Sequence, residues 1–187
     1  MRPIITMCIL GLATSAPVLA TEVVPLSPFN SIELRGGGEV ELRPGAVQRV
    51  IIVEGSSQFT SVRVVSNRRL KIDACNARCP RHYRLRVLVE SPAVPVLAVE
   101  GGGKITAAPN FANQRELTVA VNGGGAVDAR AIPADDVTAA VHGGGEIKVR
   151  ARRVLTAAVV GGGSVHYWGN PSVTTAIEGG GRVSPGS

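Results

Sequence analysis

The chain has 187 residues, a formal charge of +6 at neutral pH, 23 glycines and only 3% aromatic residues. Because 44% of the residues are hydrophobic, enough apolar surface is present to exclude a disordered chain. Glycine and β-branched valine are poor helix formers, so the composition also argues against a helical bundle. The length predicts a single domain.

Residues 1–20 have the pattern of a secretory signal peptide. Arg2 gives a positively charged start, residues 4–12 are mostly apolar, and the small-residue sequence Val18-Leu19-Ala20 precedes Thr21. The apolar stretch is shorter than the roughly 20 residues of a membrane-spanning helix, which disfavours an uncleaved anchor. We expect export to the periplasm, the outer-membrane surface or the outside of the cell, with residues 21–187 as a single mature domain that has no transmembrane segment.

Residues 29–97 alternate short apolar runs with turn residues. Strand character is found in residues 31–42, 49–54, 62–65, 70–72 and 84–90. Turn residues separate these runs at Pro44-Gly45, Gly55-Ser56 and Asn67-Arg68. The spacings favour antiparallel hairpins or meander strands, so we expect a less regular, partly antiparallel part that covers the N-terminal end of the core.

Cys75 and Cys79 are the two cysteines that follow the signal sequence. An even number of cysteines in an exported chain predicts one disulfide between them. A zinc site would need two further ligands, of which only His82 lies near, and a redox motif would have two residues between the cysteines rather than three. We expect no metal and no cofactor.

Basic residues gather around these cysteines, at Arg78, Arg81, His82, Arg84 and Arg86. Guanidinium groups can bind an anionic polysaccharide, the phosphates of lipopolysaccharide or an anionic lipid. The alternative is a solvated basic loop without a ligand. Nucleic acid is disfavoured because export is expected and because no aromatic residues are interleaved with a basic face.

Internal repetition is the dominant feature of residues 98–187. Gly-Gly-Gly triplets begin there at Gly101, Gly123, Gly143, Gly161 and Gly179, and an earlier triplet begins at Gly36. The flanking residues alternate between apolar and polar, which indicates strands. A repeat of 18 to 22 residues predicts one coil of a parallel β-helix, or β-solenoid, right-handed on general grounds.

We expect the triplets at corners where each coil turns between sheets, because only glycine tolerates a positive φ or a very close backbone there. The expected corner residues are Gly101, Gly102, Gly103, Gly123, Gly124, Gly125, Gly143, Gly144, Gly145, Gly161, Gly162, Gly163, Gly179, Gly180 and Gly181. A phosphate-binding loop is disfavoured, since no helical pattern follows any triplet.

Few other residues suggest chemistry. Tyr167 and Trp168 lie in a predicted turn, where Trp168 either stacks on a sugar or a partner, or covers an edge of the core. Asp135-Asp136 is the only adjacent acidic pair and is expected in a solvated loop. His142 and His166 are expected at the surface, so no catalytic residue is predicted.

The same residues resemble the family of auto-transporter adhesin head GIN domains. The resemblance begins at residues 29–37, 40–42 and Pro44-Gly45, and continues through 70–72, 85–87 and 95–97 into the glycine turns. It covers residues 29–184, although this chain has Gly-Gly-Gly where the family often has Gly-Ser-Gly or a Gly-Ile-Asn head. It implies a fold similar to pectin-lyase-like β-helices, no established catalytic set and a role in bacterial cell-surface adhesion.

We therefore expect an exported, non-catalytic β-solenoid that serves adhesion or interaction at the cell envelope. Its expected partner is an anionic glycan or another envelope component. One alternative is a carbohydrate-active enzyme on a lyase-like β-helix. The other is a structural envelope protein that forms homo-oligomers through the exposed ends of its coils.

Overall fold

The computed structural model describes residues 21–76 and 78–186, so the expected signal peptide lies outside the described residues. Within these residues the chain forms fifteen strands and one short 3-10 turn, and it contains no α-helix. The all-β prediction is therefore confirmed. None of the described segments is a helix long and apolar enough to cross a membrane.

The strands follow one another along the chain with few long connections. They are β1 (Glu22–Val24), β2 (Ser31–Gly36), β3 (Glu39–Pro44), β4 (Arg49–Glu54), β5 (Ser61–Val65), β6 (Arg69–Asp73), β7 (Arg86–Ser91), β8 (Val96–Gly101), β9 (Lys104–Ala107), β10 (Gln114–Gly123), β11 (Ala126–Gly143), β12 (Glu146–Gly161), β13 (Ser164–Trp168), β14 (Ser172–Glu178) and β15 (Arg182–Pro185). The 3-10 turn, Ser66–Arg68, joins β5 to β6.

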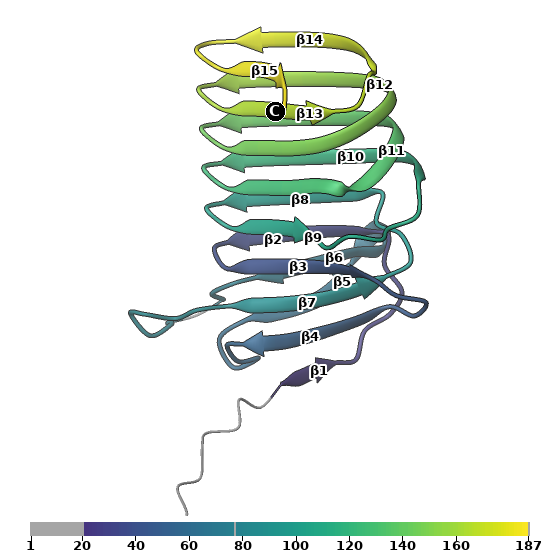
Figure 1. The fold of residues 1–187 in the computed structure, drawn as a ribbon. Helices are drawn as coiled ribbons and strands as arrows, with labels where there is room; N and C mark the ends of the chain where they lie inside the picture. Colours follow the sequence, from purple (N-terminus) through teal and green to yellow (C-terminus); the bar gives the residue numbers. More distant parts are fainter. Residues whose placement is uncertain (1–20, 77, 187) are drawn as a thin grey trace, which may run out of the picture.

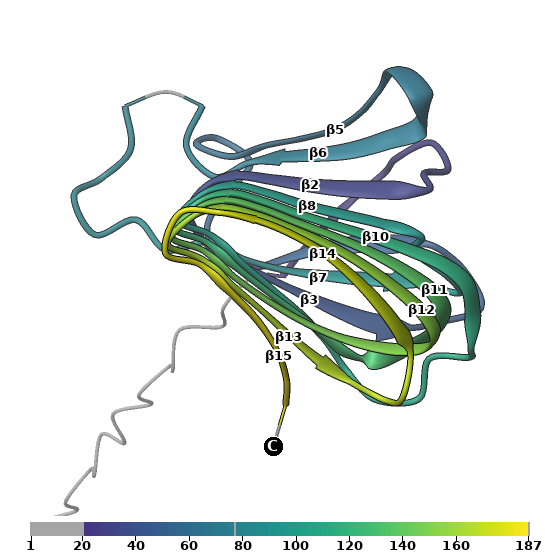
Figure 2. The same ribbon diagram turned by 90° about the horizontal axis from the view of Figure 1, so that it is seen from above.

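All fifteen strands belong to one mixed sheet that wraps around a single core (Figure 1). One face of this sheet contains β2, β8, β10 and β14, and the other contains β3, β9, β13 and β15. The long strands β11 and β12 bend from the second face into the first, and β11 pairs with β9 near its start and with β10 near its end. Seen from above, the two faces diverge from the corner where the glycine triplets lie (Figure 2).

Parallel pairing relates successive glycine repeats, and we call the chain between one triplet and the next a winding. Gly101 is the register partner of both Gly36 and Gly123, and Gly143 is the partner of both Gly123 and Gly161. The triplets thus lie in a row along one corner of the molecule. A regular, right-handed parallel β-helix stays a prediction, because the sheet also contains antiparallel pairs.

The antiparallel pairs all lie at the N-terminal end. On one face β4 pairs antiparallel with β7 and with β1, and on the other face β5 pairs antiparallel with β6. These strands lie below the first parallel windings on both faces, as the spacing of residues 29–97 suggested. The connection between β6 and β7 leaves the sheet as a long projecting loop (Figure 1).

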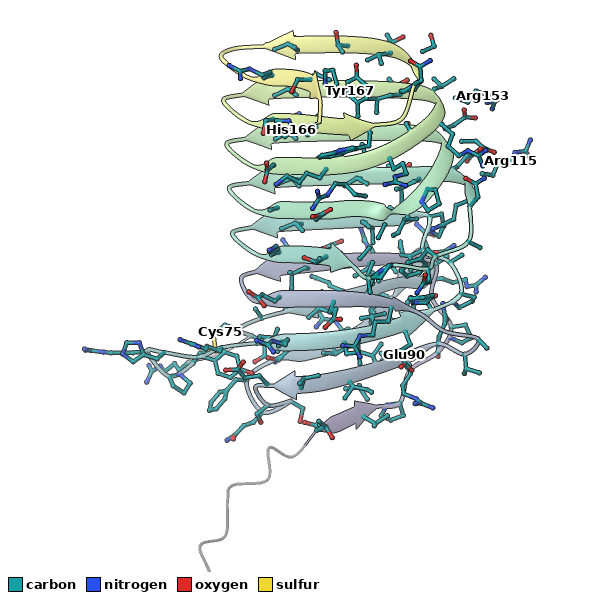
Figure 3. The ribbon with its side chains drawn as sticks, viewed as in Figure 1. Cys75, Glu90, Arg115, Arg153, His166 and Tyr167 are labelled. Atoms are coloured by element: carbon teal, nitrogen blue, oxygen red, sulfur yellow. A yellow bond between two sulfur atoms is a disulfide. The ribbon has the colours of Figure 1, made fainter. Side chains whose placement is uncertain are left out.

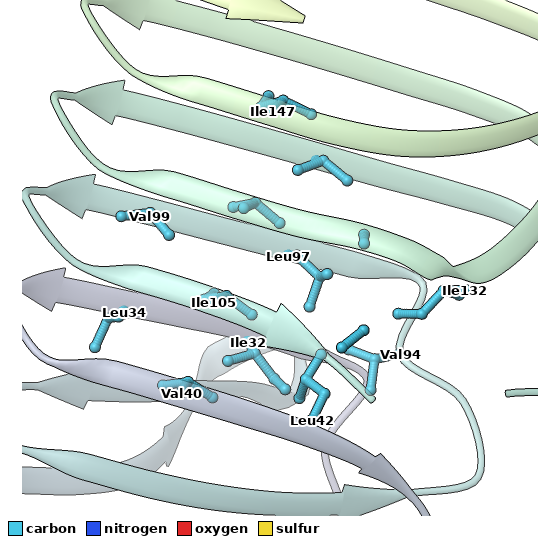
Figure 4. Packing of buried hydrophobic residues seen from close by; sticks show 14 of the residues in the cluster. Ile32, Leu34, Val40, Leu42, Val94, Leu97, Val99, Ile105, Ile132 and Ile147 are labelled. Carbon is cyan, nitrogen blue, oxygen red and sulfur yellow. The ribbon is translucent and has the colours of Figure 1, made fainter. Parts of the chain in front are cut away.

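The core consists of small and medium apolar side chains arranged in columns. Side chains alternate along a strand, so every second residue points inward. Paired strands lie about 4.8 Å apart, so equivalent residues of successive windings stack at that distance. One column contains Val99, Val121, Val141 and Val159, none more than 1% exposed, and Figure 4 shows the packing at its lower end. Burial of each such side chain stabilises the fold by about 1.5–3 kcal/mol.

The three glycines of a triplet meet different constraints. The first, such as Gly143, has a positive φ of 110°, which side chains of L-residues rarely adopt. The third, such as Gly145, leaves no room for a Cβ atom, which would lie 2.7 Å from the Gly125 carbonyl oxygen and closer still to Val121 Cγ1. The middle one, Gly144, has nothing within 4 Å of that position. The expected need for glycine therefore applies to the first and third positions and not to the middle one.

Candidate functional site

The predicted basic residues other than Arg86, which is the first residue of β7, lie in the loop between β6 and β7. This loop projects from the body of the molecule (Figure 2). A disulfide joins Cys75 to Cys79 across a Cα–Cα distance of 6.1 Å. This predicted bond is therefore present, and it closes the first part of the loop. We call residues 75–86 the basic loop.

The base of the basic loop is fixed to the sheet by Tyr83. Its hydroxyl group accepts a hydrogen bond from the backbone N–H of Ser56 at 2.9 Å and lies 2.6 Å from Oγ1 of the buried Thr60. The ring packs edge-on against Phe59 with centroids 5.5 Å apart. Leu85 enters the core two residues later. The loop is thus anchored at its base and presents its other side chains to solvent.

Arg78, Arg81, His82 and Arg84 are exposed on this loop. Arg86 begins β7 and lies 3.9 Å from a carboxylate oxygen of Glu39. Arg78, Arg81 and Arg84 form no salt bridge with any other described residue. Elsewhere many arginines are paired, as in Arg35 with Glu100 at 2.6 Å.

The loop therefore holds most of the excess positive charge. The whole chain has a formal charge of +6, and Arg2 lies in the expected signal peptide. Residues 21–187 therefore have a net charge of +5. The basic loop contains four arginines and no Asp or Glu, so it accounts for four of these five charges. A projecting segment with unpaired guanidinium groups attracts anions, and it can form bidentate bonds to carboxylates or phosphates.

A hollow of about 400 Å³ lies beside the base of the loop. Arg84, Arg86 and Lys104 line it together with Glu39 and Glu54. The lysine comes from β9, one winding further along the chain, and no pattern in the sequence associated it with the loop. Only the pairing of β3 with β9 brings Lys104 next to Glu39.

Tyr167 and Trp168 lie at the end of β13, far along the stack from the basic loop (Figure 3). The guanidinium carbon of Arg130 lies 4.9 Å from the centroid of the Trp168 ring. The ring also abuts Gly186, where an added Cβ atom would overlap its six-membered ring. Trp168 is half-buried, so this geometry favours the predicted alternative in which it covers an edge of the structure.

Arg130 is itself held by Asp128, to which it donates hydrogen bonds of 2.9 and 2.6 Å. Burial raises the pKa of Asp128, but the hydrogen bonds and charge of Arg130 outweigh this effect and leave the pKa below its ordinary value. A hollow of about 610 Å³ lies beside this group and beside Arg150. Aligning the repeats would have revealed the column of Arg150 and Trp168, which are register partners.

The other polar candidates are engaged in structural contacts. Asp136 pairs with Arg153, and Asp135 lies 4.0 Å from Arg152 and accepts a hydrogen bond from Asn113. Both aspartates belong to β11 rather than to the loop that was predicted. His166 lies 3.1 Å from the Ser184 hydroxyl group, whereas His142 is exposed.

The sequence of this chain matches one protein-family model. The model described as "Putative auto-transporter adhesin, head GIN domain" matches residues 28–115 and 111–171. The chain belongs to this family. The resemblance based on residues 29–184 is thereby confirmed, and the basic loop and β13 both lie within the matched part of the GIN domain.

No curated protein matches this GIN domain. Several solved structures are similar to it over most of its length. A putative adhesin from Bacteroides fragilis NCTC 9343 has 19% identity, with 89% of this chain and 96% of that chain covered and a TM-score of 0.46. A putative lipid binding protein from Parabacteroides distasonis ATCC 8503 has 17% identity, coverages of 90% and 96% and a TM-score of 0.37. A putative cell adhesion protein from Clostridium sporogenes ATCC 15579 has 12% identity, coverages of 89% and 98% and a TM-score of 0.38.

Among residues 21–76 and 78–186, the GIN domain has no group of three or more His, Cys, Asp or Glu side chains placed to hold a metal ion. The candidate binding residues predicted from the sequence lie in two separate parts of the structure. One is the basic loop, with Arg78, Arg81, His82, Arg84 and Arg86, and the other is the end of β13, with Tyr167 and Trp168.

Proposed function

We propose that this GIN domain is an exported, non-catalytic β-solenoid that acts in adhesion at the cell envelope, and that its basic loop binds an anionic envelope component. The observation that carries the proposal is the concentration of unpaired arginines in one projecting, disulfide-closed loop. The family description supports an adhesive role.

The chemistry of the loop favours carboxylate or phosphate groups displayed on a glycan. Arg78, Arg81 and Arg84 are exposed and have no acidic partner among the described residues, so an incoming anion displaces only water. Charge-assisted hydrogen bonds of this kind contribute about 1.5–3 kcal/mol each where they are shielded, and less at an exposed site. Several arginines on one loop therefore favour a polyanion over a single small anion.

The test measures binding of the purified chain to two immobilised polyanions and one neutral polymer. Polygalacturonate displays carboxylates, lipopolysaccharide displays phosphates, and dextran displays neither. We expect binding to at least one polyanion, none to dextran, and weaker binding at higher salt. Preference for one polyanion identifies which anion the loop binds.

Two matched double variants locate the binding site. We expect Arg81→Ala with Arg84→Ala to weaken binding by about tenfold or more, which corresponds to about 1.4 kcal/mol. The control, Arg115→Ala with Arg150→Ala, removes the same charge from exposed, unpaired arginines outside the loop and should change binding less than about threefold. Equal losses in both pairs, or binding to neither polyanion, would contradict the proposal.

Export is tested separately on the native protein. Fractionation of cells should place the protein in an envelope or extracellular fraction. Mass spectrometry should then find Thr21 as the first residue. A cytoplasmic protein that retains Met1 would rule out export and, with it, an adhesive role at the envelope.

A further inference from the structure

The C-terminal end of the sheet has two free edges. β14 pairs only with β12, and β15 pairs only with β13 (Figure 1). The outer N–H and C=O groups of both strands therefore have no ladder partner among the described residues. Such an edge is a template for pairing with another strand.

The apolar side chains at this end are also uncovered. Ile177 is the register partner of Val159, which is completely buried, yet Ile177 itself is 44% exposed. Val173 is likewise 37% exposed, whereas its partner Leu155 is buried. These residues occupy core positions of the last winding, and no described strand lies beyond them to complete their burial.

We infer that a second copy of this chain covers the open end and forms a two-fold symmetric dimer. The residues around Gly180 are self-complementary, because residues at equal distances before and after it form complementary pairs. Glu178 precedes the last triplet and Arg182 follows it, and one residue further out Ile177 corresponds to Val183. A symmetric interface requires such a pattern, since every contact occurs twice.

The outline of the C-terminal end determines which two-fold axis allows two copies to superimpose. The two faces diverge from the glycine corner, so the end has a tapered outline (Figure 2). A two-fold axis that runs along the strands, midway between the faces, places corner over corner and superimposes the two outlines. An axis across the strands would place the narrow corner of one copy over the wide side of the other.

This axis places β14 antiparallel to β15 of the partner subunit, on both faces at once. Ile177 then lies opposite Val183 of the partner subunit, where both side chains point toward the core. Glu178 lies opposite Arg182 of the partner subunit on the outer surface. Glu178 and Arg182 are both exposed, and neither forms a salt bridge with another described residue. Pro185 has no N–H group and ends the ladder after Ser184.

Association of this kind stops at a dimer. At the N-terminal end β1 pairs only with β4 and β5 only with β6 among the described residues, so these two are also edge strands. They do not flank a glycine corner, however, and have no equivalent of the Glu178 and Arg182 pair. An isologous contact uses the same surface on both copies, so association through the C-terminal end is complete at two copies. The dimer is independent of the basic loop, which lies near the other end.

Sedimentation velocity of the purified chain over a range of concentrations tests the inference. We expect a concentration-dependent monomer–dimer equilibrium. The charge reversals Glu178→Arg and Arg182→Glu should each weaken the dimer by about tenfold or more, because each places like charges together at two symmetric contacts. Combining them should restore affinity to within about threefold of the unaltered chain, because the opposite charges face each other again.

Arg115→Glu is the matched control, since Arg115 is exposed and unpaired outside this end, and it should leave the equilibrium unchanged. Circular dichroism and thermal unfolding establish that each variant is folded. A chain that stays monomeric at every concentration, an open-ended series of larger species, or a double reversal that fails to restore the dimer would each overturn the inference.

Discussion

The two ends of the molecule treat the same kind of residue differently. At the N-terminal end, Val50 and Ile52 of β4 are 1% exposed, because β7 and β1 flank that strand and neighbouring residues pack over it. At the C-terminal end, Val173 and Ile177 occupy core positions but are 37% and 44% exposed. Inward direction along a strand therefore does not ensure burial. In a stacked structure, burial also requires a neighbour on the far side.

The largest expected difference between the two ends is in the free energy of unfolding after side-chain truncation. Ile52→Ala should lower it by about 2–5 kcal/mol, because the change leaves a cavity in a covered part of the core. Ile177→Ala should lower it by less than about 1 kcal/mol when the chain is monomeric, since the side chain is already in contact with water. Denaturant unfolding at low protein concentration measures both values, and equal losses would remove the distinction between the ends.

A smaller difference is expected along the glycine corner. Gly145→Ala should destabilise the chain by about 1–3 kcal/mol, because the added methyl group meets the Gly125 carbonyl oxygen and Val121 within a closed stack. Gly181→Ala introduces the same kind of contact with Val159 and the Gly163 carbonyl oxygen. It should cost less, because nothing described lies beyond the last winding to prevent it from moving away.

The middle glycine provides the control for this series. Gly144→Ala should change the free energy of unfolding by less than about 0.5 kcal/mol, since nothing lies within 4 Å of the added atom. Thermal unfolding of the three variants under one set of conditions is sufficient. A loss at Gly144 as large as at Gly145 would show that the triplet is needed for a reason other than contact geometry.

The smallest expected effect concerns the side-chain contacts that hold the C-terminal windings together. Arg130 bonds to Asp128 and lies over Trp168, so it links separate windings. Arg130→Gln should raise the pKa of Asp128 toward its ordinary value, because burial is then opposed only by the backbone N–H of residue 130 and the charge of Lys148. NMR titration of the Asp128 carboxyl group measures this change.

The same variant should alter the pH dependence of stability. Because the folded state lowers the pKa of Asp128, its contribution is present above the unfolded-state pKa and is lost as the pH falls through the folded-state pKa. Arg130→Gln should reduce this acid-dependent loss. The effect is small because Arg130 is largely exposed to solvent. An unchanged Asp128 titration would show that Arg130 does not control this carboxylate.

Several features could be predicted from residues that are close in the sequence. The alternation of the residues that flank the triplets indicated strands, and β10 is one of them. Cys75 and Cys79 form the predicted disulfide. The recurrence of the triplets with similar flanking residues indicated that they would lie at equivalent corners, and their first glycines are register partners. The strands and corners could be predicted because side chains alternate with a period of two residues in every strand, so each winding repeats the same pattern.

Other features depend on contacts between windings. The sequence singled out Trp168 as a candidate for stacking on a ligand, but only the fold places Arg130 and Gly186 against its ring. Asp135 and Asp136 were expected in a loop, whereas the register shifts near Pro133 allow β11 to continue through them. A bulge changes which residues become neighbours, and no local pattern in the sequence specifies that change.

By itself the sequence determined that the chain is all-β, where several strands of residues 29–97 lie, and that glycine corners recur. The tertiary structure decided which arginines lack acidic partners, which aromatic ring is covered, and that core positions of the last winding are left partly exposed. The physical reason is that side-chain alternation is set within a strand, whereas pairing, burial and charge neutralisation depend on the register between windings that are 18 or more residues apart.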